Sequence, residues 1–292
     1  MKRRDFIRTA TGAIAGGALL PAGLRAMTSA GLHPKPGAAG LSSTAGSLEP
    51  IGLQLYTVRG EMARNVDATL AAVSRIGYRE VEFAGLFNHT AREVRAMLDA
   101  HGLMAPSSHV GMPRDMADWP AMLEDALTLG QSYIITPSFP SRDLSPDGMK
   151  RIADQFNAAG AAARKAGLQF GFHNHSAEFT PVDGQVPYDT LLAECDPHLV
   201  CFEIDIYWMI TGGRDPLEYL ARFPHRFPMV HAKGRAADGK MVDVGAGTID
   251  YPKILAAFKR AGLQHCFVEH DHPADPMASA QASFNYLSAL KF

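Results

Sequence analysis

The sequence predicts a single-domain (β/α)8 TIM barrel of the α/β class, and three observations lead to this fold. From Ile51 onward, eight short apolar runs alternate with longer segments of helical period, as in repeated βα units. Four of the helical segments end directly before a glycine, and a strand-like run follows each time. Of the 292 residues, about 240 remain for the barrel, within the ~200–250 that one α/β barrel commonly occupies.

The eight predicted strands are short apolar runs. In chain order they are Ile51–Val58, Tyr78–Ala84, Met104–Val110, Tyr133–Pro137, Leu168–His175, Val200–Tyr207, Met229–Lys233 and Cys266–His270. Parallel strands joined by crossover helices explain the alternation, and eight such strands close a barrel. A doubly wound open sheet is the alternative fold, but it usually carries a Gly-rich phosphate-binding turn after its first strand, which this chain lacks.

The predicted helices are placed by the spacing of their apolar residues and by the glycines that follow them. Asn65–Ile76 carries Val66, Leu70 and Val73 on one face, and Gly77 ends it as a C-terminal glycine in the left-handed region would. The same order of helix, glycine and strand recurs with helices at Ala91–His101, Pro146–Ala166 and Tyr251–Ala261, which precede Gly102, Gly167 and Gly262.

Composition excludes several classes of function. The chain is 47% hydrophobic and 20% charged, with a net charge of -2, so it has no basic excess for nucleic acid and no solvating acidic tail. The three cysteines, Cys195, Cys201 and Cys266, show no CxxC spacing. They are therefore predicted to be buried thiols rather than a disulfide framework or a thiolate metal site.

The N-terminus resembles a twin-arginine export signal. Arg3 and Arg4 precede a weakly hydrophobic, Gly-rich run over residues 11–20, which is too short to span the ~30 Å of a bilayer core. An amphipathic helix or a short membrane anchor is the alternative. The predicted organisation is a signal over 1–26, a flexible linker rich in Gly, Ala, Ser and Pro over 27–49, and the barrel over 50–292. We expect a periplasmic or otherwise exported protein with no stable membrane anchor.

Polar side chains gather at the ends of the predicted strands, where the catalytic residues of a βα barrel lie. The period of two places Glu203, Asp205 and Tyr207 on one face of the sixth strand, which in a barrel is the interior. The other polar residues at these ends are Gln54, Tyr56, Glu82, His109, His173, Asn174, His175, Glu178, His231, Lys233, Glu269 and Asp271.

The carboxylates and histidines of this set predict a metal site. An unpaired buried carboxylate loses several kcal/mol of solvation, and a divalent cation would supply the missing countercharge. Carboxylates and imidazoles from separate strands suit manganese or magnesium, and they also tolerate zinc, cobalt or iron through the histidine nitrogen. We expect one divalent ion, with manganese as the first choice.

Four segments carry a resemblance to a known family. They are Gly52–Arg59, Phe172–Phe179, Glu203–Trp208 and His231–Gly234, and they are similar to the sugar phosphate isomerase/epimerase family, the xylose isomerase-like barrels that also include inosose dehydratase. The resemblance covers nearly the whole chain after the linker. It implies a TIM barrel and an isomerase or epimerase that acts on a carbohydrate.

The resemblance also implies a ligand set. In epimerases of this family, strands five to eight hold one divalent ion with Glu, Asp, His and Glu, and Asp205, His231 and Glu269 match the last three. Where the first glutamate stands, this chain has His173, so Glu178 is the predicted fourth ligand and His173 the next candidate. Such epimerases move a proton with two carboxylates, and the loss of one points to different chemistry.

The remaining candidate residues fall into two groups. The catalytic candidates are His175 as general base, because an imidazole of ordinary pKa accepts a proton at neutral pH, together with Glu178 and Lys233. Lys233 would neutralise an oxyanion or pair with Glu203. The candidates for binding substrate are Gln54, Tyr56, Glu82, His109, His173, Asn174 and Trp208. Trp208 would stack on a sugar face or pack against its neighbours.

All of the predicted reactions begin by removing a proton beside a carbonyl group. The first expectation is an isomerase or epimerase acting on a free, non-phosphorylated sugar, because phosphorylated sugars are cytoplasmic and this chain is predicted to be exported. The alternative is a lyase or hydrolase that acts by elimination on 3-keto-glycosides or inosose-like keto sugars. A non-catalytic sugar-binding protein is a weaker third candidate. The expected partner is a small carbohydrate, and the sequence leaves open whether the chain forms a homo-oligomer.

Overall fold

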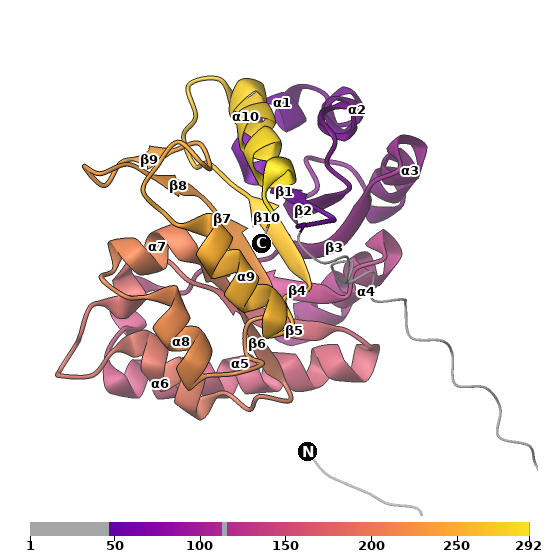
Figure 1. Ribbon diagram of the computed structural model, residues 1–292. Coiled ribbons are helices and arrows are strands. Elements are labelled where there is room, and N and C mark those ends of the chain that lie inside the picture. Colours follow the sequence, from indigo (N-terminus) through magenta and orange to yellow (C-terminus); the bar gives the residue numbers. More distant parts are fainter. Residues whose placement is uncertain (1–46, 113–115, 292) are drawn as a thin grey trace, which may run out of the picture. The chain divides into compact units, whose positions relative to one another are not determined.

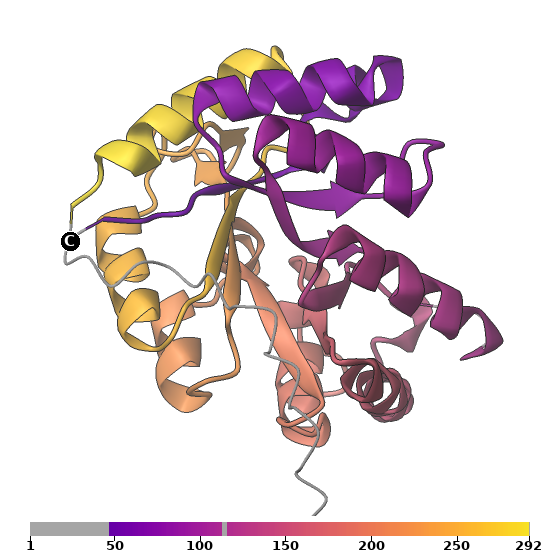
Figure 2. The same cartoon turned by 90° about the vertical axis from the view of Figure 1, so that its right-hand side faces the viewer.

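Parallel strands joined by helices form a closed barrel in this chain. The computed structural model describes residues 47–112 and 116–291, in which eight strands form a closed barrel with the helices on its outside (Figures 1 and 2). The predicted TIM barrel is confirmed. Around the barrel the strands follow the order β1 (Gly52–Gln54), β10 (His265–Val268), β7 (Met229–Ala232), β6 (Val200–Asp205), β5 (Gln169–His173), β4 (Tyr133–Thr136), β3 (Met104–His109) and β2 (Glu80–Ala84).

The helices connect these strands and cover the barrel. They are α1 (Arg59–Arg64), α2 (Val66–Ile76), α3 (Ala91–His101), α4 (Trp119–Leu129), α5 (Pro146–Ala166), α6 (Pro187–Glu194), α7 (Ile206–Thr211), α8 (Pro216–Arg222), α9 (Tyr251–Arg260) and α10 (Pro276–Ala289). A small antiparallel pair, β8 (Gly234–Arg235) and β9 (Met241–Val242), follows β7.

The helices predicted from glycine punctuation lie where the sequence placed them, to within one residue at each end. Helix α3 shows the reason, since local signals fix both of its ends. Thr90 and Glu93 form a reciprocal capping box at its start, and Gly102 ends it with a φ of 64°, a left-handed conformation that glycine adopts without strain.

Most strands end one or more residues earlier than the sequence predicted, and at two of them a polar side chain caps the helix that follows. The side chain of Gln54 accepts a hydrogen bond from the backbone of Tyr56, and a 3-10 helix over Leu55–Val58 begins there. Asp205 Oδ1 accepts from the backbone N–H of Trp208 at 2.9 Å and begins α7. Tyr207 therefore lies in α7, and its predicted place on the inner face of the sixth strand is wrong.

The barrel interior is apolar toward the N-terminal ends of the strands. Tyr133, Ile135, Cys201, Met229 and Phe267 form one cluster of buried residues inside it. Cys195, Cys201 and Cys266 are buried and free, as predicted, and burial raises the pKa of all three thiols. The exception at this end is the buried pair Glu80 and His265, and most other polar residues of the interior lie at the opposite end of the barrel.

Residues 1–46 lie outside the part that the structure describes, so the predicted signal and most of the predicted linker fall there. The last residues of that linker are described, and Leu48 is buried in the core with 1% of its surface exposed. The packed chain therefore begins slightly before residue 50. Within residues 47–112 and 116–291, no helix combines the length and the apolar character needed to cross a membrane.

Candidate metal centre and pocket

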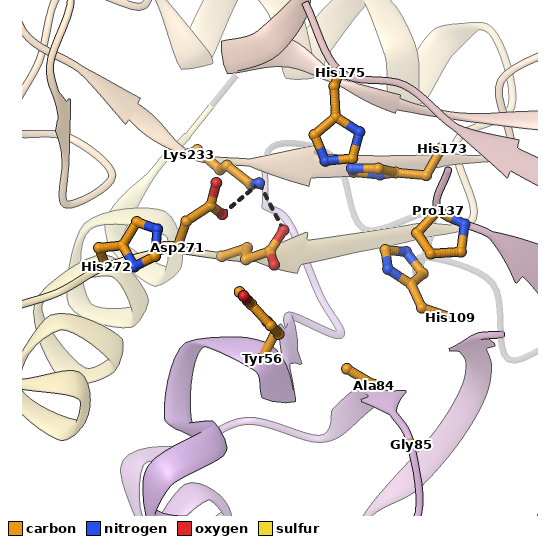
Figure 3. Close-up of a pocket in the computed structure, with 11 residues that line it drawn as sticks. Tyr56, Ala84, Gly85, His109, Pro137, His173, His175, Lys233, Asp271 and His272 are labelled. Atoms are coloured by element: carbon orange, nitrogen blue, oxygen red, sulfur yellow. Dashed lines mark hydrogen bonds and ion pairs between the residues drawn. The ribbon is translucent and has the colours of Figure 1, made fainter. Parts of the chain in front are cut away.

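A pocket of about 500 Å³ opens at the C-terminal ends of the barrel strands. Figure 3 shows the side chains that point into it from several strands and from the loops that follow them. They are Tyr56, Ala84, Gly85, His109, Pro137, His173, His175, Lys233, Glu269, Asp271 and His272. This is the end of the barrel where the sequence predicted the chemistry.

Two overlapping groups of side chains beside this pocket have the spacing of metal ligands. In the first, the Asp205 cluster, the ligand atoms of His173, Asp205, His231 and Glu269 all lie within 4.8 Å of one another. Each comes from a different strand end, and all four side chains are buried. The second, the Glu203 cluster, shares two of these histidines and consists of His109, His173, Glu203 and His231.

The hydrogen bonding of the buried polar atoms in the Asp205 cluster is compatible with a divalent ion. Asp205 Oδ2 and His173 Nδ1 are buried and make no hydrogen bond within the described residues, although Asp205 Oδ2 lies 3.0 Å from the ammonium of Lys233. His173 Nε2 lies 3.6 Å from Asp205 Oδ2, and His231 Nδ1 lies 2.8 Å from Glu269 Oε2. Buried donors and acceptors in native proteins are normally hydrogen-bonded, and an ion at this cluster would give Asp205 Oδ2 the further partner that it lacks.

Charge at the site supports the same conclusion. Five carboxylates come together here, those of Glu82, Glu203, Asp205, Glu269 and Asp271. The cationic groups facing them are Lys233 and, when protonated, His109 and His231. Two negative charges remain even then, which is the charge that one divalent cation neutralises.

Neighbouring carboxylates raise the pKa of two histidines of the site, His231 and His109, and a metal ion bound to His231 would take the place of one ring proton. Burial lowers the pKa of His231, but the charge of Glu203 and hydrogen bonds to Glu203, Glu269 and Glu82 hold it well above its usual value. Burial likewise lowers the pKa of His109, and Glu82 and Glu203 raise it overall. Burial and the charge of His231 lower the pKa of His173 well below its usual value, so His173 is neutral and available as a ligand.

Lys233 is held by three carboxylates. Its Nζ lies 3.0 Å from Asp205 Oδ2, 2.8 Å from Glu269 Oε2 and 2.7 Å from Asp271 Oδ1 (Figure 3). Burial lowers its pKa, but these carboxylates more than compensate, so the pKa is raised and the side chain is an ammonium ion. The alternative pairing of Lys233 with Glu203 is wrong, because Glu203 Oε2 faces His109, His173 and His231 instead.

His175 follows the end of β5 and points into the pocket (Figure 3). Burial, together with the positive charge of Lys233, lowers its pKa to about 4. The expectation of an ordinary imidazole pKa is therefore wrong. The ring is therefore unprotonated throughout the neutral range, and the lowered pKa makes it a weaker base than a free histidine.

Glu178 does not join either cluster of the described residues. It lies in a 3-10 turn over Ala177–Phe179, and its Oε2 accepts a hydrogen bond from the backbone N–H of His175 at 3.0 Å. His173 is the last residue of β5 and faces the barrel interior, so it occupies the place predicted for Glu178. Glu178 stays outside both clusters because its carboxylate turns back to cap its own loop.

The residues predicted to bind substrate divide into two sets. Tyr56, His109 and His173 line the pocket, whereas Gln54, Glu82, Asn174 and Trp208 are not part of its lining. Asn174 holds Asp205 in place: its Nδ2 donates to the backbone oxygen of Asp205 at 3.3 Å, and its Oδ1 accepts from the backbone N–H at 3.0 Å. Trp208 lies under Lys233, whose Nζ is 5.7 Å from the ring centroid.

Glu82 orients a candidate ligand. Its Oε2 lies 2.7 Å from His231 Nε2, so the other ring nitrogen, Nδ1, is the one turned to Glu269 in the Asp205 cluster. Gln54 Nε2 and Ser107 Oγ donate to the two oxygens of Glu82 at 2.7 and 2.5 Å. A carboxylate behind a metal-binding histidine fixes the tautomer and the direction of the ring.

Sequence reasoning gave no role to Ser107 or His272, placed Asp271 at the mouth without a function, and offered Glu203 only as a partner of Lys233. The period of two placed Glu203 beside Asp205 on the inward face of the sixth strand, but it gave no sign of the three histidines that its Oε2 faces. Ser107 carried no signal, since its contact with Glu82 depends on the register between β2 and β3.

Comparison with known proteins agrees with this geometry. A family model described as the xylose isomerase-like TIM barrel matches residues 70–290. A sugar phosphate isomerase/epimerase from Parabacteroides distasonis is 28% identical, with a TM-score of 0.72 over 85% of this chain and 96% of its own. A 3-keto-D-glucoside 4-epimerase from E. coli shares the fold, with a TM-score of 0.62 over 82% of this chain and 98% of its own at 17% identity.

The curated relatives match shorter stretches of the chain. An inosose dehydratase from Geobacillus kaustophilus is 24% identical over 193 residues, which span 57% of this chain and 61% of that relative. The chain thus matches about three-fifths of the length of that protein.

Proposed function

The chain belongs to the xylose isomerase-like TIM barrel family, and from this premise we propose that it is a metal-dependent enzyme that removes a proton beside the carbonyl group of a non-phosphorylated keto sugar. The observation that carries the proposal is the lining of the pocket. A neutral imidazole, His175, and an ammonium ion, Lys233, face the same cavity as two members of the Asp205 cluster. This lining supports a base and an acid acting beside a candidate metal centre.

The residues that would hold the ion are His173, Asp205, His231 and Glu269. A divalent ion bound there would polarise the carbonyl oxygen of the substrate and acidify the neighbouring C–H bond. Because His173 replaces a carboxylate, the donor set has two nitrogens and two oxygens. Manganese remains the first choice, and this set favours zinc, cobalt and iron over magnesium, which prefers oxygen ligands.

Lys233 and His175 divide the proton transfers between them. His175 accepts the proton from the carbon beside the carbonyl, since its ring is neutral and free to bind one. Lys233 donates a proton to the leaving oxygen, because its ammonium lies in the pocket and an alkoxide is a stronger base than the amine, even though the carboxylates around Lys233 raise its pKa. The ion pair with Asp271 keeps the ammonium turned toward the cavity.

Among the outcomes of proton removal, one base and one acid support elimination best. As His175 takes the proton, the C–H electrons form a C=C bond, the C–O bond at the β carbon breaks, and Lys233 protonates the leaving oxygen. An enone and an alcohol or water result. A two-base epimerisation would need a second base across the sugar from His175, where Figure 3 shows Tyr56. The dehydratase named among the curated relatives supports elimination.

Isomerisation is the second candidate. A single base can remove a proton from one carbon and return it to the next, so His175 also suffices for an aldose–ketose exchange. The 28% identical structure called a sugar phosphate isomerase/epimerase favours this outcome.

Reaction in D2O tests the proposal and separates the two outcomes. The metal-loaded enzyme would be incubated with a 3-keto-glucoside, an inosose and free aldoses, and the products followed by NMR. Elimination releases the leaving group and forms an enone, whereas isomerisation returns a ketose labelled at the exchanged carbon. No deuterium uptake and no product from any of these compounds would contradict the proposed function.

Glu82→Gln is expected to weaken metal binding by ~10- to 100-fold, the effect typical of removing the carboxylate behind a metal-binding histidine. The side chain keeps its size, but the charge that orients His231 is lost. Titration with Mn²⁺ measures the dissociation constant. Glu80→Gln is the matched control, because Glu80 is a buried carboxylate bonded to His265, outside both clusters. Equal affinities for the Glu82 and Glu80 variants would rule out the orienting role.

We also propose that the chain is exported through the twin-arginine pathway, which supports a non-phosphorylated substrate. Replacing Arg3 and Arg4 together with lysine is expected to leave the precursor in the cytoplasm, because the paired arginines are the recognised feature of the signal. Cell fractionation and immunoblotting measure the distribution. Normal export of the double variant would show that the signal is of another type.

A further inference from the structure

We propose that Tyr56, supported by Arg59, is a stacking platform for a second ring of the substrate, so that the substrate is a keto-glycoside rather than a single free sugar. The proposal rests on the proposed function and names the class of compound that the same pocket accepts. Four features support it: the volume of the pocket, the exposure of Tyr56, the contact of its ring with Arg59, and the charge of the groups that line the pocket.

The pocket is larger than one sugar ring requires. A hexose has twelve non-hydrogen atoms. Even if each atom took up the ~30 Å³ that one water molecule occupies in the liquid, the hexose would fill at most about 360 Å³. The pocket holds about 500 Å³. Space therefore remains for a further ring beside the reacting one.

Tyr56 is unusually exposed for an aromatic residue in a polar pocket. With 39% of its surface exposed, it is one of four large hydrophobic residues in the described chain that are exposed, and it alone of the four lines the pocket. An exposed apolar surface inside a binding cavity is typical of ligand contact. Ring faces of sugars and of aromatic groups both stack on tyrosine.

Arg59 holds this ring in place. The centre of its guanidinium lies 4.0 Å from the centroid of Tyr56, and its Nη1 donates to the backbone oxygen of Tyr56 at 2.8 Å. Its Nη2 lies 3.3 Å from His272 Nδ1. This contact links the start of α1 to the loop after β10. One ring face is thus covered by the guanidinium, and the other face is left to the cavity. A preformed contact surface costs less entropy on binding.

The platform lies across the pocket from the reacting groups. In Figure 3, Tyr56 and Ala84 line the side opposite His175, with Lys233 and Asp271 toward one end of the cavity. A sugar ring held beside His175 and Lys233 therefore directs a substituent toward Tyr56. Among the residues that line the pocket, the ammonium of Lys233 is matched by three carboxylates, so a neutral second ring fits better than an anionic one.

Binding of two unoxidised glucosides tests the platform without turnover. Phenyl β-glucoside and methyl β-glucoside share the sugar and differ in the second ring, and calorimetry with the metal-loaded full chain measures both dissociation constants. Wild-type protein is expected to prefer the phenyl compound. Tyr56→Ala is expected to weaken phenyl glucoside binding by about 2- to 10-fold, the range of one aromatic stacking contact, and to lower the phenyl-to-methyl preference by the same factor.

Three further variants make the test specific. Tyr56→Phe is expected to keep the preference, because it keeps the ring, and Arg59→Ala is expected to lose part of it, because the ring is no longer held. Leu127→Ala removes an exposed apolar side chain outside the pocket lining and is the matched control. Equal binding of the two glucosides, no binding of the phenyl compound, or an equal loss for both in Tyr56→Ala would overturn the platform. Failure of proton exchange in D2O with an intact preference would instead overturn the proposed reaction.

Discussion

Replacing Asp205 with alanine or asparagine is expected to abolish stoichiometric metal binding while the barrel stays folded. Asp205 Oδ2 faces His173 and Lys233, and either substitution removes this charged oxygen from the cluster. Asparagine keeps an oxygen that can accept from the N–H of Trp208, so the start of α7 is retained. Elemental analysis after Mn²⁺ loading and dialysis measures the ion, and circular dichroism checks the fold.

Asp215→Asn is the matched control for this experiment. Asp215 begins α8 in the same manner, since its Oδ1 accepts from the backbone N–H of Leu217 at 2.8 Å, but it belongs to neither cluster. Its variant is expected to bind metal as the wild type does. Full metal content in Asp205→Asn would refute the assignment of Asp205 as a ligand.

His175→Ala is expected to lower kcat by ~10²- to 10⁴-fold, the contribution of one general base, with a smaller change in KM because other groups bind the substrate. Metal content is expected to survive, since His175 is not a member of the Asp205 cluster. Steady-state kinetics on a compound that the wild type converts, together with elemental analysis, measures both quantities.

Glu178→Gln serves as a control on the same loop. It weakens the contact with the backbone of His175 but leaves the imidazole in the pocket, so a much smaller loss of kcat is expected. A near-normal kcat in His175→Ala would show that the proton goes to another group, such as Glu269. Loss of the ion in that variant would instead make His175 a ligand.

Local signals explain which parts of the fold were readable from the sequence. The helix α3 was predicted to the residue because Thr90, Glu93 and Gly102 fix its ends through contacts within the chain segment itself. The end of β6 was not, because Asp205 serves both as the last strand residue and as the cap of α7. Because one side chain serves both elements, the pattern of polar and apolar residues does not show where the strand ends and the helix begins.

The sequence predicted which residues face the candidate site, but not which of them contact one another. The period of two showed that Asp205 and His231 face the barrel interior, but not that His231 contacts Glu82 from the opposite part of the barrel. That contact depends on how eight strands close. The position of Glu178 was unpredictable for a similar reason, since a carboxylate matches the chemistry of a ligand but its loop turns it toward the backbone of His175.

A crystal structure of the Mn²⁺-loaded protein, with the anomalous signal of manganese, tests the central claim most directly. The account predicts one peak per chain within bonding distance of His173, Asp205, His231 and Glu269, with Glu82 behind His231. A peak within the Glu203 cluster alone, a peak bound by Glu178, or no peak after soaking would contradict it.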